Sequence, residues 1–335
     1  MSTTEAEHRL AIRALADDFE SAEKARVLLD LTLRDPGTAS HVREAVAPDP
    51  HAGERAHKAH DRHNLHSMRA MPALFDELSA RMGRWGWNAW YRFFSWYVQR
   101  TPAQFSCMNW GYRGPDVPVL EGPERYCLQL YEHVVAGMPL RDARMVEIGS
   151  GRGGGLAHLC VTHAPQSALG IDFVPRHTQL SNRSFQHLAP RLRFDTADAE
   201  ATRLDDASAD VLISVESSHC YPSQPRFLRE ARRVLHPGGL LGWVDFRPIA
   251  AVQQVQHDAL ETGFEIVAQQ DITSDVLAAM REDAQRRVDL VHRYTHPILH
   301  RTLLNFAAAA SDCDTVRRLA DGSYAYFSLR LRRAV

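Results

Sequence analysis

The sequence predicts an α/β fold with a doubly wound, Rossmann-like sheet of seven strands, and two observations carry this prediction. From residue 144 onward, short apolar runs that suit buried strands alternate with segments of helical periodicity, and such alternation produces parallel strands joined by right-handed crossovers. The first apolar run is followed at once by the glycine-rich stretch GSGRGGG at 149–155. A glycine turn between a strand and a helix is typical of a nucleoside-binding site at the carboxyl edge of a parallel sheet.

The seven strands are assigned to runs rich in apolar and β-branched residues. These runs cover residues 144–148, 167–171, 192–196, 211–215, 240–246, 265–269 and 324–331, and the last two are expected to finish the sheet in an antiparallel arrangement. Between the sixth and seventh strands, residues 274–322 form a helical insertion that is long for an ordinary connection. An insertion of this length beside the carboxyl edge predicts a substrate lid.

The first hundred residues have a different character, with helical periodicity, few glycines and no strand-like runs. We therefore expect a helical N-terminal extension at 1–100 and the sheet domain at 101–335. Within the extension, the stretch at 47–66 contains five histidines, four of them spaced by three: His51, His57, His60, His63 and His66. Because no cysteine or carboxylate cluster completes a metal shell, they are interpreted as part of a solvated segment, and no metal is predicted.

An aromatic stretch at 85–97 holds four of the six tryptophans of the chain. Such a stretch can pack a helix onto the core, form one wall of an apolar substrate chamber, or serve as an interfacial surface for a lipid-like substrate. The sequence alone leaves these three interpretations open.

Composition excludes several classes of partner. A formal net charge of -2 and a pI near 6.8 provide no basic field for nucleic acid. Five scattered cysteines without C-x-x-C spacing indicate a reducing compartment and neither a disulfide framework nor a zinc site. No signal-like N-terminal run and no apolar stretch of membrane-spanning length is found, so we expect a cytoplasmic protein without integral membrane contact.

The glycine turn is compatible with two cofactors. Gly149, Gly151 and Gly154 match the G-x-G-x-x-G spacing of dinucleotide sites, so the spacing leaves NAD open. Glu147 directly before the turn would repel a pyrophosphate but suits the ammonium group of a methionine moiety. Asp172, at the end of the second strand, can accept both hydroxyls of a ribose. Together these residues favour S-adenosylmethionine (SAM).

Two further residues are candidates for cofactor contacts. Asp198 follows the third strand, where a carboxylate can accept the adenine amino group, although a helix cap or a loop acid is the alternative. Tyr112 belongs to the segment FSCMNWGY at 105–112, which can close over a cofactor and offer the tyrosine hydroxyl to its carboxylate. A plain core-packing role for Tyr112 stays open.

The fourth strand runs into ESSHCYP at 216–222, where a sulfonium methyl would face its acceptor. Methyl transfer needs alignment, and also a base if the acceptor is a hydroxyl. His219 is the candidate base, since imidazole takes a proton near neutral pH; its alternative is to fix the loop. Glu216 can hold the substrate hydroxyl or brace His219, and Cys220 is interpreted as a packing residue.

Several stretches together resemble the phthiotriol/phenolphthiotriol dimycocerosate methyltransferase family. They are residues 109–121, the turn at 147–155, VESSHCYP at 215–222, LHPGG at 235–239 and DFRP at 245–248. The resemblance implies the class I methyltransferase fold, SAM as cofactor, and O-methylation of a large apolar, polyketide-derived molecule. The same region of the chain is more distantly similar to tocopherol and sterol C-methyltransferases. The first hundred residues have no counterpart in that family, so the particular acceptor is not implied.

These motifs and the resemblance together predict a SAM-dependent methyltransferase that acts on a lipophilic small molecule of secondary metabolism. The predicted cofactor contacts are Tyr112, Glu147, Gly149, Ser150, Gly151, Asp172, Phe173, Asp198 and Ala199. The predicted catalytic residues are His219 and Glu216, and the predicted acceptor contacts are Trp110, Tyr221, His292 and His296. C-methylation, a cyclase or pericyclase that keeps SAM structurally, and a non-enzymatic binding subunit stay open. So do a homodimer and a carrier-protein partner.

Overall fold

A computed structural model of the chain describes residues 105–294, 300, 304 and 313–335. The chain divides into two compact units, 1–81 and 82–335, and every described residue belongs to the second. The predicted N-terminal extension with its histidines and aromatic stretch, and also His296, lie outside the described residues. The predicted domain boundary at residue 100 therefore stays a prediction.

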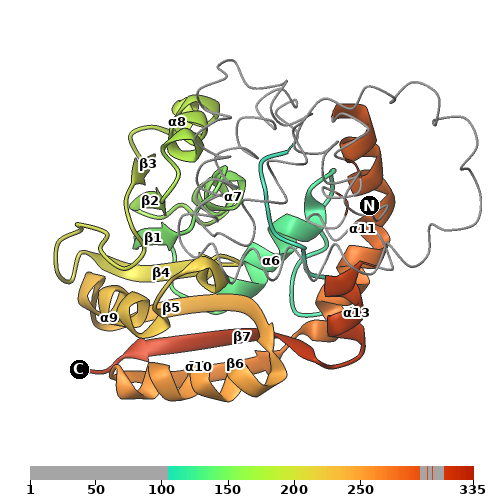
Figure 1. Ribbon diagram of the computed structural model, residues 1–335. Coiled ribbons are helices and arrows are strands. Elements are labelled where there is room, and N and C mark those ends of the chain that lie inside the picture. Colours follow the sequence, from blue (N-terminus) through green and yellow to red (C-terminus); the bar gives the residue numbers. More distant parts are fainter. Residues whose placement is uncertain (1–104, 295–299, 301–303, 305–312) are drawn as a thin grey trace, which may run out of the picture. The chain divides into compact units, whose positions relative to one another are not determined.

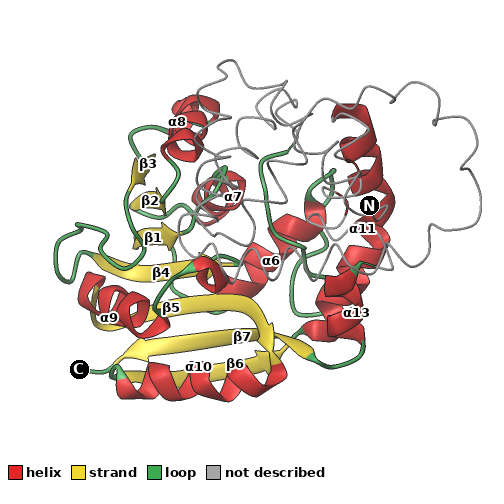
Figure 2. Cartoon of the chain, in the orientation of Figure 1, coloured by secondary structure: helices red, strands yellow, loops and turns green. Residues whose placement is uncertain are grey.

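The predicted seven-stranded sheet is confirmed (Figures 1 and 2). Its strands are β1 (Arg144–Ile148), β2 (Ser167–Asp172), β3 (Leu192–Thr196), β4 (Ala209–Val215), β5 (Leu235–Pro248), β6 (Phe264–Asp271) and β7 (Tyr324–Arg333). They lie in the order β3-β2-β1-β4-β5-β7-β6. β7 is antiparallel to both of its neighbours, and the pairs on the β3 to β5 side are parallel. β5 begins earlier than predicted, because Leu235 already pairs with β4 ahead of a register shift.

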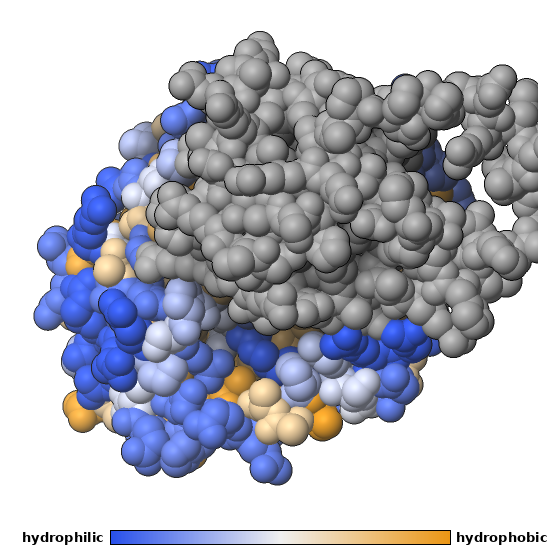
Figure 3. Space-filling view, viewed as in Figure 1, coloured by the Kyte–Doolittle hydropathy of each residue, from blue (hydrophilic) through white to orange (hydrophobic). Residues whose placement is uncertain are grey.

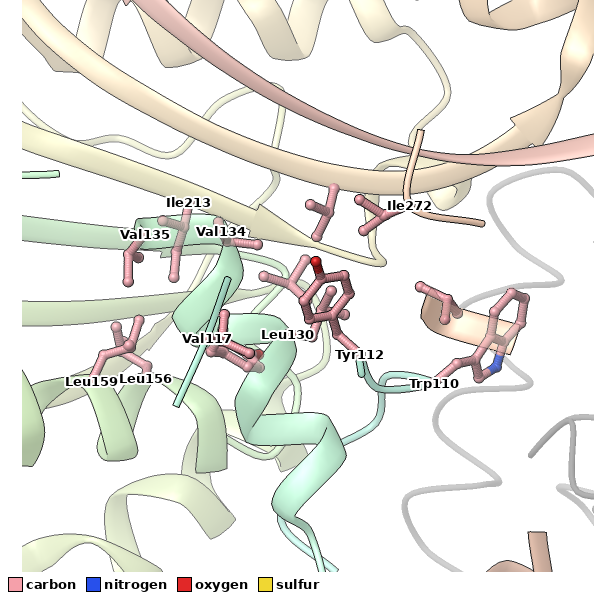
Figure 4. Close-up of a cluster of buried hydrophobic side chains, with 14 of the residues drawn as sticks. Trp110, Tyr112, Val117, Leu130, Val134, Val135, Leu156, Leu159, Ile213 and Ile272 are labelled. Carbon is pink, nitrogen blue, oxygen red and sulfur yellow. The ribbon is translucent and has the colours of Figure 1, made fainter. Parts of the chain in front are cut away.

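Helices cover both faces of the sheet. Their bounds are α6 (Arg125–Val135), α7 (Gly154–His163), α8 (Pro175–Ser184), α9 (Gln224–Val234), α10 (Ile249–Glu261), α11 (Thr273–Tyr294) and α13 (Asp314–Ala320), with short 3-10 helices η1 (Gln186–Leu188) and η2 (Ser218–Cys220). One hydrophobic cluster joins the sheet to α6, α7, α11 and α13 (Figure 4), and a second joins it to α9 and α10. The domain is thus the three-layer sandwich expected of a doubly wound sheet.

The alternation of side chains along β1 decides which face each residue meets. Met145 belongs to the cluster under α6 and α7, whereas Val146 and Ile148 belong to the cluster under α9 and α10. Glu147, two residues after Met145, therefore points toward α6. A strand with apolar residues on both faces carries one carboxylate into the core.

The sheet order reverses between β1 and β4, the two central strands whose next neighbours lie on opposite sides. Ligands of such sheets bind at the carboxyl ends of the strands next to this reversal. The carboxyl ends of β1, β2 and β4 meet there: the glycine turn follows β1, Asp172 ends β2, and His219 follows β4. The topology thus confirms that the predicted motifs share one edge.

The insertion between β6 and β7 is helical in its described parts, α11 and α13. Its role as a substrate lid stays a prediction. The visible surface of the described residues is mainly hydrophilic, with hydrophobic residues scattered over it (Figure 3). In the part of the chain that the structure describes, no helix combines the length and the hydrophobicity needed to cross a membrane.

Candidate functional site

The turn after β1 is held by the next strand. Gly149 and Ser150 both donate their N–H groups to the carbonyl oxygen of Ile171, at 2.8 and 3.0 Å. Gly149 has a φ of +80°, and a Cβ at this position would lie 2.3 Å from the Cβ of Ser217. The left-handed backbone and the close approach of the loop after β4 both require glycine.

The later glycines of the run serve a different purpose. A Cβ on Gly155 would lie 1.9 Å from Cζ of Tyr131, and one on Gly154 would lie 2.2 Å from Oγ of Ser106. The N–H of Gly154 also donates to the carbonyl of Ser106, at 3.1 Å. These two glycines therefore leave space for α6 and for the segment before it.

Glu147 is fully buried at the end of β1. Its Oε1 accepts the hydroxyl of Tyr131 at 2.7 Å, whereas its Oε2 has no hydrogen-bond partner among the described residues. Burial raises the pKa of Glu147 to about 8, against the Tyr131 hydrogen bond, which lowers it, and with Asp172, which raises it further. The sequence predicts that the ammonium group of the cofactor binds at Glu147, and the unpartnered oxygen of this buried carboxyl group is available to accept it.

Asp172 ends β2 and braces the glycine turn. Its Oδ2 accepts the N–H of Gly151 at 2.8 Å, and its Oδ1 accepts the N–H of Val174 at 2.8 Å and contacts Nδ1 of His177 at 3.1 Å. A carboxylate offers about four lone-pair directions, so this bracing is compatible with the predicted ribose contacts. Those contacts stay a prediction.

The predicted adenine end of the site lies beside it. Asp198 follows β3, accepts the N–H of Glu200 at 3.0 Å, and is partly buried. The N–H of Ala197 donates to the carbonyl of Asp172, at 3.2 Å, so the ends of β2 and β3 are tied together. Ala199 is buried, while Phe173 is 41% exposed. The structure brings these residues to one edge, and their contacts with adenine stay predictions.

His219 lies on η2 directly after β4, beside Asp245 of β5. The carboxylate of Asp245, which is fully buried, accepts the backbone N–H of His219 at 2.9 Å and contacts its Nδ1 at 2.8 Å. It also accepts the hydroxyl of Ser218 at 2.6 Å and pairs with Arg247 at 3.3 Å. Asp245 therefore fixes the orientation of the imidazole, with Nδ1 toward the carboxylate and Nε2 on the opposite side of the ring.

The same contacts shift both pKa values. Burial lowers the pKa of His219, but Cys220 and the carboxylate of Asp245 outweigh it and raise the pKa well above its ordinary value. Burial raises the pKa of Asp245, but Arg247, His219 and Ser218 outweigh this effect and hold the pKa well below its usual range. The charged form of the pair is thus favoured, as in a histidine whose proton is stabilised by an orienting acid.

Glu216 braces the segment before α6. Its Oε1 accepts the backbone N–H of Trp110 at 2.7 Å and the hydroxyl of Tyr326 at 2.5 Å. Its backbone is left-handed, with a φ of +45°, a strain that non-glycine residues show mainly at functional sites. Burial raises its pKa to about 7, although the bonds from Tyr326 and Trp110 lower it. Its described hydrogen bonds therefore run to Trp110 and Tyr326, and its catalytic role stays a prediction.

Aromatic rings line the side of His219. Phe246 stacks on Trp110 with ring centroids 4.4 Å apart, and it lies 4.6 Å from the His219 ring. Tyr326 lies 6.3 Å from Trp110, and the carbonyl of Trp110 accepts Nη2 of Arg287 at 2.7 Å. Trp110, Phe246 and Tyr326, which we call the aromatic wall, join the predicted acceptor residue to the candidate base.

Other predicted residues lie apart from this group. The Tyr112 hydroxyl donates to Asp116, and the ring packs in the core beside α6 (Figure 4). The Tyr221 hydroxyl hydrogen-bonds to Ser217 at 2.7 Å, next to Gly149 rather than on the wall. His292 lies on α11 and stacks on His300 at 4.5 Å. The structure therefore supplies a packing role for Tyr112, and the ligand contacts of all three stay predictions.

Two residues that complete the site were not identified from the sequence. Asp245 has a usable signal, because the carboxyl ends of adjacent parallel strands meet at one edge and the predicted fifth strand contains this acid. Tyr131 has none, since its contact with Glu147 depends on how α6 packs over β1 and α7. Asp245 contacts the predicted residue His219, and Tyr131 contacts the predicted residue Glu147.

The residues of the turn fit SAM. Glu147 Oε2 and Ser150 Oγ are buried and lack a hydrogen-bond partner in the described part of the chain. An ammonium group supplies three donors and a positive charge for such acceptors, whereas a pyrophosphate supplies neither. Within the described residues, no group of three histidine, cysteine or acidic side chains could hold a metal ion.

Comparisons with known proteins agree with this site. Residues 146–242 match a protein family described as a methyltransferase domain. The chain is 33% identical to the phthiotriol/phenolphthiotriol dimycocerosates methyltransferase of Mycobacterium leprae over 62% of its own length and 77% of that relative. It is 28% identical to the fatty-acid O-methyltransferase of Mycolicibacterium smegmatis, over 63% of this chain and 78% of the relative.

Among solved structures, the [4+2]-cyclase SpnF matches with a TM-score of 0.62 and 20% identity, covering 76% of this chain and 97% of that one. At this identity the likeness shows the fold alone, which is the predicted Rossmann-like methyltransferase fold. The family assignment rests on the 33% identity to the Mycobacterium leprae relative and on the 77% of that relative which the match covers. The chain is a SAM-dependent methyltransferase and belongs to the phthiotriol/phenolphthiotriol dimycocerosates methyltransferase family.

Proposed function

We propose that this enzyme methylates a hydroxyl group of a lipophilic small molecule of secondary metabolism, with His219 as the general base. The observation that carries the proposal is the contact between Nδ1 of His219 and the buried carboxylate of Asp245, at 2.8 Å. It orients an imidazole at the edge where the glycine turn lies. The names of the relatives support the substrate class, and that of the fatty-acid O-methyltransferase supports oxygen as the acceptor atom.

When bound, SAM supplies a methyl group made reactive by a positively charged sulfur. Glu147 and Ser150 would hold its methionine end, and Asp172 its ribose. His219 takes the proton of the acceptor hydroxyl as the new C–O bond forms and the C–S bond breaks, leaving the C–S electron pair on sulfur. Asp245 stabilises the imidazolium that results, as the acid of a histidine–acid pair does in other enzymes.

The aromatic wall supports an apolar acceptor. Phe246 lies next to the His219 imidazole and Trp110 stacks on Phe246, and aromatic faces bind apolar groups while excluding water. Exclusion of water also protects the reaction from competing proton transfer. A wall of this kind suits the alkyl or ring portion of a lipophilic molecule next to its reacting hydroxyl.

The test is to incubate the enzyme with labelled SAM and apolar extracts of the producing cell, and to follow which molecule gains one CH₂ unit by mass spectrometry. With that acceptor, His219→Ala is expected to lower kcat by about 10²- to 10⁴-fold, the usual contribution of a general base. The affinity for SAM should stay unchanged. His257→Ala, on the exposed side of α10, is the matched control. Full turnover by His219→Ala across the pH range would contradict the proposed role.

A further inference from the structure

The candidate cofactor site contains a fully buried acid that has no positive partner among the described residues. Glu147 has one hydrogen bond, from the Tyr131 hydroxyl, and an unpartnered Oε2 among the described residues. The titratable groups that act on it are Tyr131 of α6, Asp172 of β2 and, more weakly, Cys107 of the segment before α6. None of these three can carry a positive charge.

The turn has its own cation, Arg152, which is not among the groups that shift the pKa of Glu147. The charge of Arg152 acts on Glu124, and its guanidinium lies over the ring of Phe105, 5.5 Å from the centroid. A buried carboxylate without a cation costs several kcal/mol and avoids that cost by taking up a proton. The pKa of about 8 that burial gives Glu147 agrees with this reasoning.

We propose that Glu147 is protonated while the pocket is empty and releases its proton to solvent when the ammonium group of the cofactor binds beside it. The inference rests on the assignment of this pocket to SAM. One proton is released whichever partner keeps the shared proton in the complex. The bound pair is either a carboxylate with an ammonium or a carboxylic acid with a neutral amine. Both pairs contain one proton fewer than the protonated Glu147 and the free ammonium group before binding.

Tyr131 acts as a positioning residue for this exchange. Its hydroxyl occupies Oε1 and so leaves Oε2 as the oxygen that meets the ligand. Its ring lies where a side chain on Gly155 would otherwise stand, which holds the hydroxyl in place. Because this hydrogen bond lowers the pKa of Glu147, its removal should extend the protonated form to higher pH.

The test is isothermal titration calorimetry of the full-length protein with S-adenosylhomocysteine, which has the same ammonium group and is not consumed. Titrations in phosphate and in imidazole at pH 7, and in phosphate and in Tris at pH 8, give the number of protons released from the difference in heat. For a group with a pKa of about 8, about 0.9 proton should leave at pH 7. At pH 8 the release should fall to about 0.5 proton or less, because half of Glu147 is already ionised and part of the ligand's own amine is already neutral. Affinity should rise by about tenfold per pH unit below about pH 7 and should stop rising near pH 8, where the ligand's amine also loses its proton.

Three controls assign the released proton to Glu147 and to the ammonium group that meets it. 5′-Methylthioadenosine lacks the ammonium group and should bind without proton release. Tyr131→Phe should release more protons at pH 8 than the natural protein, whereas Glu147→Gln should release none and lose the pH dependence of affinity. Tyr131→Phe keeps the proposal testable if Glu147→Gln does not fold.

The outcomes separate the inference from the assignment of the pocket. If neither nucleoside binds, the cofactor pocket itself is wrongly assigned. If S-adenosylhomocysteine binds at pH 7 with the same heat in both buffers, the pocket stands and the proton coupling is wrong. Equal proton release with S-adenosylhomocysteine and with 5′-methylthioadenosine would also overturn it, because the ammonium group would then have no part in the exchange.

Discussion

At the scale of single residues, the site works through acids that neighbours and burial drive in opposite directions. Glu147 and Glu216 are raised to pKa values of about 8 and about 7, whereas Asp245 is held well below its usual range. The difference lies in the partners, since Asp245 faces Arg247 and His219 while Glu147 meets a neutral hydroxyl. Acids with separated pKa values can take separate roles in one pocket.

Asp245→Asn should separate orientation from charge. The amide removes the negative charge that raises the pKa of His219, so the rising limb of the pH–rate profile should move to lower pH. The maximal rate should fall by about 10²-fold or more, since the imidazolium loses its counter-charge. Asp210→Asn, which removes a partner of Arg144 at the start of β4, is the matched control. An unshifted profile in Asp245→Asn would contradict the pairing.

Trp110→Leu should separate acceptor binding from cofactor binding. The backbone N–H that reaches Glu216 is retained, while the ring that stacks on Phe246 is lost. The KM for the acceptor is expected to rise about tenfold, in line with roughly 1.5 kcal/mol for one aromatic contact. The affinity for S-adenosylhomocysteine, measured by calorimetry, should change little. Equal loss of both affinities would indicate that Trp110 supports the fold rather than the wall.

At the scale of elements, the strands were predictable and the contacts between elements were not. β1, β2 and β4 are largely apolar runs that end at or next to a glycine or an acid, and β1 to β4 all fall within two residues of prediction. Contacts such as Tyr131 with Glu147, or His219 with Asp245, join residues from different elements. They depend on sheet order and helix packing, which local pattern does not contain. The loop motif was therefore recognised, but its supporting residues were not.

Gly155→Ala tests the packing of α7 against α6. The added Cβ would overlap the ring of Tyr131, so the variant should lose about 1–3 kcal/mol of unfolding free energy, the usual cost of overpacking. Urea denaturation measures this loss. In a Tyr131→Ala background the same substitution should cost little, because the obstructing ring is gone. Additive effects in this double-mutant cycle would contradict a direct clash.

At the scale of the whole molecule, buried groups of the site make stability depend on pH. The folded pKa values of Glu147, Glu216 and His219 are raised above their ordinary values. Each group binds its proton more tightly in the folded chain. Its stabilising contribution is therefore complete below the unfolded pKa and is lost as pH rises through the folded pKa. Asp245 has the opposite sign, and its contribution is lost only as pH falls through its lowered pKa.

The ligand-free protein should consequently become less stable between pH 5 and pH 8, the window between the ordinary carboxyl pKa and the raised values of about 7 and about 8. Thermal melts at half-unit pH intervals measure this trend. The Glu147→Gln and Glu216→Gln double variant should flatten it, because two of the three responsible groups no longer titrate, whereas Glu261→Gln on the exposed end of α10 should not. A melting temperature that rises over this window, or a double variant with an unchanged slope, would show that the acids of the site do not govern the pH response of the molecule.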